Sequence, residues 1–269
     1  MITELKCFGV AAGGGNAALV IQNDHSSADE RQQLARLHSK PACVFIDSGE
    51  RGMEADEAGV VLDFYYPHMR SPLCLHATLA AARVLLSPQR PTLLVRTAMH
   101  GQALTLILRD GEVFIQLVPQ TPPAVEIPDE LPALLLAAPG IRLASPPVIA
   151  SVGSPKLLLE VADSATLHAL HPDLQRIADW GKKNGVSGCY AWCRRGDGSG
   201  AVEGRNFNHL DPSLEDSATG VAAGALTVHL RRGLTLYQGA NTGQPCLIRT
   251  GLQAESILIG GATEFVPAA

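Results

Sequence analysis

The sequence predicts an α+β fold of two lobes, and three observations support this prediction. The 26 Gly and 18 Pro residues separate short apolar runs, which favours many short strands joined by turns. Each half of the chain contains one almost wholly apolar helical segment, at residues 76–86 and 218–230. Residues 119–128, Pro-Gln-Thr-Pro-Pro-Ala-Val-Glu-Ile-Pro, form a Pro-rich connector between the halves. We therefore predict an N-terminal lobe of residues 1–121 and a C-terminal lobe of residues 122–269. The last strand is a candidate to return to the N-terminal lobe.

The second half of the chain repeats the pattern of the first. In the first half, a charged surface helix is predicted at 29–38, and strands at 5–10, 17–22, 43–46, 60–66, 92–96, 104–108 and 113–118. In the second half, helices are predicted at 129–138 and 165–180, and strands at 157–161, 188–194, 201–207, 247–249 and 257–259. The Gly-rich residues 195–200 are typical of a hairpin turn.

Composition and charge exclude several classes of protein. The 269 residues are 46% apolar and 17% charged, as in a soluble globular protein. A net charge of −5 without a basic run argues against nucleic-acid binding. Apolar stretches such as 131–143 end or are interrupted well short of the ~20 residues that a membrane helix needs. No apolar signal-peptide region opens the chain, so we expect a cytoplasmic protein.

The six cysteines are scattered, which does not indicate a disulfide framework in a chain of this length. Cys189 and Cys193 lie four residues apart, but a structural zinc site needs a second ligand pair at suitable spacing. We therefore expect core packing for this pair, and no metal site.

Functional candidates gather where the two apolar helices begin. Residues 71–83 and 213–225 each place polar or reactive side chains directly before an apolar helix. A helix that is apolar on all sides is buried, so its first N–H groups need partners, and a bound carboxylate is a suitable one. Two such helix N-termini facing one cleft would bind a small carboxylate. The alternative is two capped core helices without a ligand.

Four segments resemble the phenazine-biosynthesis (PhzF-like) isomerase family. Residues 74–79, Cys-Leu-His-Ala-Thr-Leu, resemble its Cys-Gly-His-Ala-Thr-Leu, and residues 215–224, Glu-Asp-Ser-Ala-Thr-Gly-Val-Ala-Ala-Gly, resemble its Glu-Asp-Pro-Ala-Thr-Gly-Ser-Ala-Ala-Gly. Residues 14–17, Gly-Gly-Asn-Ala, resemble its Gly-Gly-Asn-Pro, and residues 238–245 resemble its Gln-Gly-x-x-Met-Gly-Arg-Pro. The four matches occur in the family's order.

The resemblance implies a diaminopimelate-epimerase-like fold, in which each of two pseudo-symmetric lobes is a curled sheet around a central helix. The implied chemistry is cofactor-free proton transfer, as in an isomerase or epimerase, on a small carboxylate bound between the lobes. It also implies a homodimer and no metal. Carried over by residue, the resemblance places catalytic groups at Cys74, His76 and Asp216. It implies substrate-binding positions at Gly15, Asn16, Leu75, Ser217, Thr219 and Gly220.

The sequence departs from the family at the acid/base Glu of its Ser-Glu-Thr-x-Phe-Val segment. One alignment places Lys40 at that Glu, and an alignment anchored on Phe45 places Ala42 there. Neither residue is a carboxylate, which argues against the phenazine reaction itself. The resemblance also places the second cysteine of diaminopimelate epimerase at Ser217.

Each catalytic candidate also has a purely structural interpretation. Cys74 is a base if the helix N-terminus lowers its thiol pKa, and otherwise an inert core thiol. His76 orients a substrate oxygen or caps the helix. Asp216 is a second acid/base group or a helix cap.

Three other functions compete with the isomerase. They are a one-base dehydratase, a non-catalytic carboxylate-binding protein on the same scaffold, and a nucleotide-dependent oxidoreductase. The last is disfavoured because Gly13-x-Gly15-x-x-Ala18 lacks the following helix that dinucleotide binding requires.

Overall fold

The chain divides into two compact units. In the computed structural model, residues 1–38, 40–48, 59–207 and 215–267 are described. Unit 1 comprises Met1–Leu117 and Gly260–Ala269, and unit 2 comprises Val118–Ile259. The chain passes from unit 2 back into unit 1 within strand β16 (Ile257–Gly261).

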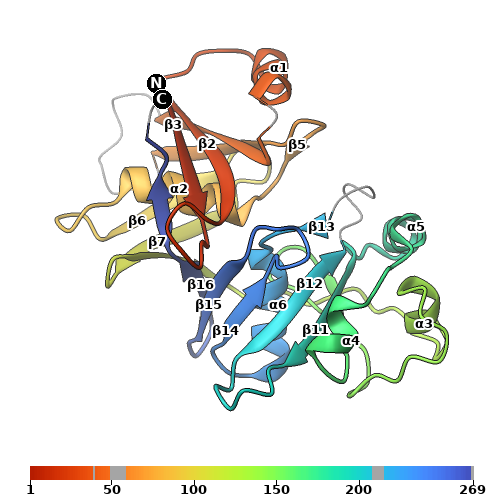
Figure 1. Cartoon of the computed structure of the whole chain (residues 1–269). Helices are drawn as coiled ribbons and strands as arrows, with labels where there is room; N and C mark the ends of the chain where they lie inside the picture. The colour runs from red at the N-terminus through yellow and green to blue at the C-terminus, as the bar shows by residue number, and fades with distance from the viewer. Residues whose placement is uncertain (39, 49–58, 208–214, 268–269) are drawn as a thin grey trace. The chain divides into compact units, whose positions relative to one another are not determined.

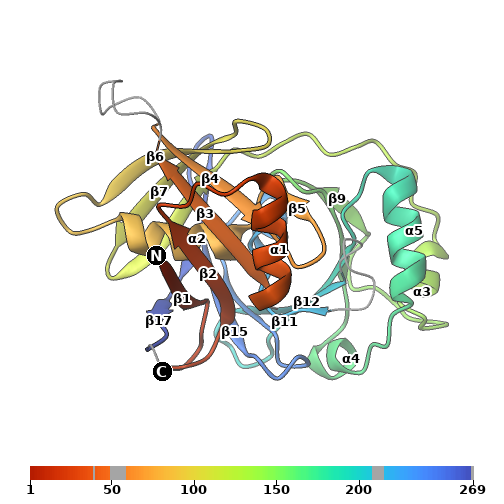
Figure 2. The same cartoon turned by 90° about the horizontal axis from the view of Figure 1, so that it is seen from above.

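Unit 1 is a curled, mixed sheet with helix α2 (Leu75–Leu85) packed against it (Figure 1). Its strands are paired in the order β17–β1–β2–β3–β4–β6–β7–β8, and β5 pairs with β4. The strands are β1 (Ile2–Cys7), β2 (Asn16–Gln22), β3 (Ala42–Ser48), β4 (Val60–Tyr65), β5 (Arg70–Ser71), β6 (Thr92–Thr97), β7 (Ala103–Arg109), β8 (Glu112–Leu117) and β17 (Thr263–Phe265). Helix α1 (Ala28–His38) covers the other face of β2 and β3 (Figure 2).

Unit 2 has the same plan around helix α6 (Gly220–Leu230), which packs on β9, β10 and β15. Its strands pair in the order β9–β10–β11–β12–β14–β15, and β13 pairs with β12. They are β9 (Val148–Ala150), β10 (Lys156–Glu160), β11 (Cys189–Arg194), β12 (Val202–Phe207), β13 (Glu215–Asp216), β14 (Thr235–Gln238) and β15 (Cys246–Leu252). The remaining helices are α3 (Leu131–Leu135), α4 (Ser164–His168) and α5 (Leu174–Asn184).

Strand pairing shows that the two units are topological repeats. In unit 1, β2 and β3 are parallel, β3–β4–β5 is antiparallel, α2 follows, and β6 returns parallel to β4. In unit 2, β10 and β11 are parallel, β11–β12–β13 is antiparallel, α6 follows, and β14 returns parallel to β12. Each central helix therefore begins four residues after its short strand ends.

In each unit, an ion pair links the short strand to the strand beside it. The short strand carries the basic residue in unit 1 and the acidic residue in unit 2. Arg70 of β5 contacts Asp63 of β4 at 2.8 Å, and Glu215 of β13 contacts Arg205 of β12 at 2.7 Å. Asp63, Arg205 and their partners occupy equivalent register positions. The Arg205–Glu215 pair is largely buried, so loss of one partner leaves an uncompensated charge. In the other pair Asp63 is buried but the Arg70 side chain is 38% exposed, and Arg31 also contacts Asp63, at 3.3 Å.

The core of unit 2 confirms that the paired cysteines take part in core packing. Cys189 and Cys193 are both fully buried, and they pack with Leu157, Ile177 and Phe207 on the face covered by α4 and α5. No group of three metal-ligating side chains occurs among the described residues. Within the same residues, no helix is long and apolar enough to cross a membrane.

Several predicted boundaries are wrong, for local reasons. The predicted helix 165–180 is two helices, α4 and α5, because Pro172 interrupts the backbone hydrogen bonding and Asp173 caps α5 by accepting from the Arg176 N–H at 3.0 Å. The predicted strand 5–10 begins at Ile2 and ends at Cys7, because Phe8 has a φ of 65°. The helix predicted at 129–138 is shorter in the structure, where α3 comprises only Leu131–Leu135. The sequence did not predict the short strands β5, β9, β13, β14 and β17.

Candidate active site

A cysteine and a histidine form a buried pair where α2 begins. Cys74 is the N-cap residue of α2, with extended backbone, and His76 is the second residue of the helix. The Sγ of Cys74 lies 3.3 Å from Nδ1 of His76 and 3.9 Å from its Nε2. Only 3% of Cys74 and 6% of His76 is exposed, so the contact is largely shielded from solvent. The structure thus brings together two of the three predicted catalytic residues.

The surroundings of Cys74 favour its thiolate form. Burial by itself raises the pKa of the Cys74 thiol. The imidazole of His76, the hydroxyl of Tyr66 and the N–H of Ala77 in the first helical turn together outweigh burial, so the pKa lies below its usual value. Because the thiolate is the reactive form of cysteine, this arrangement suits a base or a nucleophile.

Backbone contacts fix the position of Cys74. The carbonyl of Cys74 accepts hydrogen bonds from the Thr78 N–H at 2.9 Å and the Thr78 hydroxyl at 2.8 Å. Leu75 follows as the first residue of α2 and is buried. The first N–H groups of a helix have no acceptors within it, so this end also suits an anion.

Two neighbours of Cys74 were not predicted from the sequence. Tyr66 lies just after β4 and directs its hydroxyl to Cys74. Cys43 on β3 lies within electrostatic range of Cys74, and burial, with a smaller contribution from Cys74, raises the pKa of Cys43 to about 11. Cys43 therefore stays a neutral thiol at neutral pH. Tyr66 belongs to no segment with a recognisable motif, and Cys43 lies in the segment compared with the family's Ser-Glu-Thr-x-Phe-Val but replaces none of its catalytic groups. Only the folded sheet reveals that both lie near Cys74.

The predicted substrate-binding turn lies between β1 and β2. Gly15 has a φ of +102°, and a Cβ at this position would lie 2.5 Å from the carbonyl oxygen of Cys7 and 2.7 Å from the Gly9 nitrogen. Asn16 is the first residue of β2 and is 3% exposed. The turn therefore requires glycine at position 15 for steric reasons, independent of any ligand.

In unit 2, a hydrogen-bonded cluster surrounds the start of α6. The Thr219 hydroxyl donates to Oδ2 of Asp216 at 2.6 Å. The Gln238 side-chain amide donates to the Asp216 carbonyl at 2.7 Å and to the Thr219 hydroxyl at 3.1 Å. Tyr190 donates to Oε1 of Gln238 at 3.1 Å. Gln238, like Tyr190, was not named as a site residue from the sequence, although it begins the C-terminal segment that resembles the family.

The other predicted residues of unit 2 lie beside this cluster. Ser217 Oγ is 2.8 Å from Oγ1 of Thr242, and Gly220 is the first residue of α6. Thr219 is the N-cap of α6, as Cys74 is the N-cap of α2. By the internal repeat, the position equivalent to Cys74 is therefore Thr219, two residues after Ser217.

Lys40 and Ala42, the two residues that the sequence comparison suggests as counterparts of the family's Glu, have ordinary structural surroundings. Lys40 Nζ forms an ion pair of 2.8 Å with Oε1 of Glu4 and is about one-third exposed. Ala42 is fully buried at the start of β3. Lys40 thus acts here as the partner of a carboxylate on β1.

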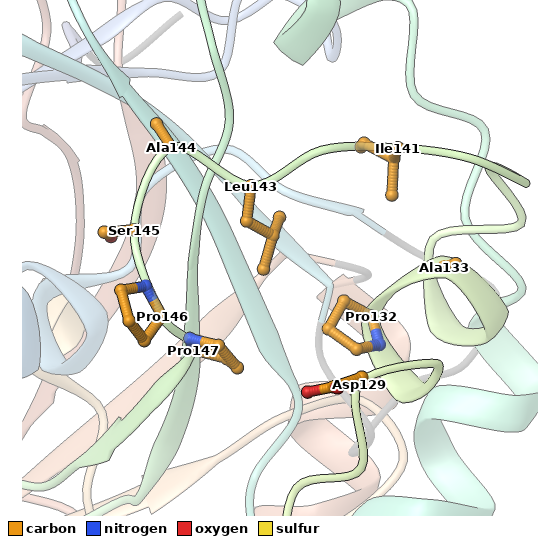
Figure 3. A pocket seen from close by; sticks show the side chains of 9 residues that line it. All are labelled: Asp129, Pro132, Ala133, Ile141, Leu143, Ala144, Ser145, Pro146 and Pro147. Carbon is orange, nitrogen blue, oxygen red and sulfur yellow. The ribbon is translucent and has the colours of Figure 1, made fainter.

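Two pockets in the described part of the chain lie apart from the predicted catalytic side chains. One, of about 400 Å³, lies between α3 and residues 141–147 in unit 2, and its wall is largely apolar and prolyl (Figure 3). The other, of about 180 Å³, lies beside the Gly-rich turn of unit 1 and is lined by Lys6 and Glu264 among others. None of the predicted catalytic residues lines either pocket.

Comparison with known proteins gives consistent results. The sequence model of the PhzC-PhzF family, described as phenazine biosynthesis-like protein, matches residues 5–261. The chain is 27% identical to an uncharacterized isomerase of Deinococcus radiodurans, over 96% of this chain and 90% of that protein. It is also 27% identical to the trans-2,3-dihydro-3-hydroxyanthranilate isomerase of Pseudomonas aeruginosa, over 86% of this chain and 82% of the relative. The crystal structure of the Bacillus anthracis phenazine biosynthesis protein of the PhzF family is similar, with a TM-score of 0.78 at 18% identity, covering 99% and 96% of the two chains.

Two repeated units, each a curled sheet around an apolar helix, define a protein with the diaminopimelate-epimerase-like fold, which confirms the predicted fold class. Within that class, the chain belongs to the PhzC-PhzF family of phenazine biosynthesis-like proteins.

Proposed function

We propose that the protein is a cofactor-independent isomerase or epimerase that moves a proton on a small carboxylate, with Cys74 as a catalytic base. The observation that carries this proposal is the buried Cys74–His76 pair at the start of α2. A thiolate held beside an imidazole, with a lowered pKa, can accept a proton from the carbon next to a carboxylate. The names of the two curated relatives, both isomerases, support the reaction class.

In the proposed reaction, the thiolate of Cys74 takes the proton from carbon and the electron pair moves onto the substrate carboxylate as an enolate. The first N–H groups of α2 stabilise that negative charge, because they have no acceptors within the helix. His76 stabilises the Cys74 thiolate before the transfer. In an epimerisation, a second group in its protonated form then gives its own proton to the other face of the same carbon, and Cys74 keeps the proton that it took. In an isomerisation, Cys74 returns its proton to a different carbon.

Asp216 is the proposed second proton-transfer group. Its carboxylate accepts from the Thr219 hydroxyl, which fixes its orientation. Gly15, Asn16, Leu75, Ser217, Thr219 and Gly220 are the proposed substrate-binding positions, on the family resemblance. A homodimer and a cytoplasmic location belong to the same proposal, on the resemblance and on the composition.

We do not assign the hydroxyanthranilate substrate of the Pseudomonas relative to this chain. That assignment would need a counterpart of the family's Glu, and Lys40 and Ala42 offer no carboxylate. The proposed substrates are therefore small amino, imino or hydroxy acids.

Solvent-deuterium incorporation tests the proposal. The wild type and Cys74→Ala are incubated in heavy water with a panel of such acids, and the products are analysed by mass spectrometry. We expect at least one acid to gain deuterium, and Cys74→Ala to lose ~10²–10⁴-fold in rate, the usual contribution of a general base. Cys43→Ala is the matched control, because it removes a buried thiol near Cys74 whose pKa is raised.

The panel also separates the competing functions. Deuterium uptake that survives in Cys74→Ala would reject Cys74 as the base. Loss of water from a substrate would indicate a dehydratase. Binding of an acid without any exchange would indicate a carboxylate-binding protein without catalysis.

A further inference from the structure

The core beneath α6 is polar at positions where the core beneath α2 is apolar. Because the strands of the two units pair in equivalent registers, each position of one unit has a counterpart in the other. Three polar side chains of unit 2, each at most 1% exposed, stand where unit 1 has buried apolar side chains: Lys156 for Ala18, Tyr190 for Val44 and Asn206 for Phe64. The fold therefore does not itself require polar groups there.

Two of these three polar side chains have hydrogen-bond partners. Tyr190 donates to Gln238 at 3.1 Å, and the ammonium of Lys156 donates to the carbonyl of Ser187. Asn206 is the exception. Neither its Nδ2 nor its Oδ1 has a hydrogen-bond partner among the residues that the structure describes, although Asn206 is fully buried. An unpaired buried amide is costly, and such groups in native proteins call for an explanation.

The strand register places this amide beside the proposed catalytic carboxylate. Asn206 of β12 lies directly opposite Asp216 of β13 in an antiparallel pair. Directly opposed residues have their side chains on the same face of the sheet, with Cβ atoms ~5 Å apart. Asp216 in turn accepts from Thr219, the N-cap of α6. The unpaired amide therefore faces the start of α6, and Asp216 and Ser217 beside it are only partly buried.

We infer that Asn206 determines substrate specificity by binding a neutral substrate group that both donates and accepts a hydrogen bond, namely a hydroxyl or a carboxamide. This inference rests on the proposed function for its substrate. A primary amide presents one donor group and one acceptor group. A carboxylate would pair only with Nδ2, and an ammonium only with Oδ1. A hydroxyl or a carboxamide pairs with both, so it leaves no polar atom of Asn206 unsatisfied.

Matched pairs of acids test this role. Alanine is compared with serine and asparagine, and proline with hydroxyproline, for binding by calorimetry and for deuterium exchange. The proteins are the wild type, Asn206→Leu and Thr263→Val. Leu has nearly the shape of Asn without its polar atoms. Thr263→Val is the control, because it removes another buried unpaired polar atom, Oγ1 of Thr263, in unit 1.

We expect the wild type to prefer the hydroxyl- or carboxamide-bearing member of a pair by tenfold or more, because sites built around a hydrogen bond discriminate strongly against analogues that lack it. Asn206→Leu should reduce this ratio to about one and raise Tm, because it removes an unsatisfied amide from the core. Thr263→Val should leave the ratio unchanged. Serine and asparagine separate the hydroxyl from the carboxamide. If Asn206→Leu does not fold, Asn206→Ala is measured in its place.

The outcomes distinguish this inference from the proposed function. Preferential binding without deuterium exchange would reject the isomerase and retain the role of Asn206. Exchange without any preference in the wild type would retain the isomerase and overturn the role of Asn206. A preference that is unchanged in Asn206→Leu would also overturn it, and a lowered Tm in that case would mean that Asn206 binds a buried water only.

Discussion

The Sγ of Cys74 lies 3.3 Å from Nδ1 of His76, and both side chains are buried at the first turn of α2. Residues two apart in a helix point to different faces. The contact forms here because Cys74 is not helical: as the N-cap it has a φ of −139° and a ψ of 103°. Cys74 and His76 therefore meet because α2 begins at Leu75. If the helix began one turn earlier, both residues would be helical and would point to different faces.

Replacement of His76 by Gln should raise the pKa of the Cys74 thiol. The imidazole is the largest of the contributions that lower this pKa against burial, so its loss leaves burial dominant. The fraction of thiolate at a given pH then falls, and the acidic limb of the exchange profile moves to higher pH. The measurement is the ultraviolet absorbance of the thiolate against pH, as the difference between each protein and its Cys74→Ser counterpart. An unchanged titration midpoint would contradict the pairing.

Replacement of Asp216 by Asn should reduce proton exchange by ~10²–10⁴-fold and leave the fold intact. The Asn oxygen still accepts from the Thr219 hydroxyl, so the contact at the start of α6 is retained. Asp163→Asn is a matched control, because Asp163 also begins a helix, by accepting from the Thr166 N–H at 2.7 Å. Exchange rates and circular dichroism of both variants are compared. Equal rates in Asp216→Asn and the wild type would remove Asp216 from the mechanism.

Replacement of Gly15 by Ala should destabilise the fold by more than replacement of Gly13. Both glycines have positive φ, which costs an L-residue about 1 kcal/mol. At Gly13 a Cβ meets nothing within 4 Å, whereas at Gly15 it meets backbone atoms at 2.5–2.7 Å. We expect a loss of about 1 kcal/mol for Gly13→Ala and of several kcal/mol for Gly15→Ala, measured by urea unfolding. Similar losses would show that the turn adjusts.

The buried Lys156 should make stability depend on alkaline pH. Burial lowers the pKa of Lys156 from its usual 10.5 to about 8, and Asp216 opposes this effect. Between these values the unfolded chain binds a proton that the folded chain does not, so the free energy of unfolding rises with pH. Below about pH 8 both states are protonated and the dependence disappears.

Lys156→Met removes this pH dependence. The difference in unfolding free energy between the wild type and Lys156→Met therefore contains the contribution of Lys156 without that of other titrating groups. Relative to Lys156→Met, the wild type should gain up to about 3 kcal/mol between pH 8 and 10.5. The free energy of unfolding of both proteins is measured by urea titration across this range. A difference that stays constant with pH would show that Lys156 titrates normally in the folded protein.

The strands and helices with strong apolar patterns could be predicted from the sequence. Helices α1, α2 and α6 were predicted to within one or two residues, because each has a clear helical pattern and ends near a Pro or Gly. Short strands such as β5 and β13 could not be predicted, because two residues carry no periodicity. They form only where the rest of the sheet offers an edge for pairing and where an ion pair holds them.

For the candidate site, the sequence by itself determined which residues precede the two apolar helices, because capping positions and motifs are local. Cys74, His76 and Asp216 are predicted in this way, as what the family resemblance of these segments implies. Only the tertiary structure placed Tyr66 and Cys43 near Cys74, and Asn206 opposite Asp216. Cys43 is distant from Cys74 in sequence, and Tyr66 and Asn206 lie on strands or loops outside the segments that precede the two helices. Their contacts depend on sheet register, and a register shift of one residue would turn each of the strand residues to the other face.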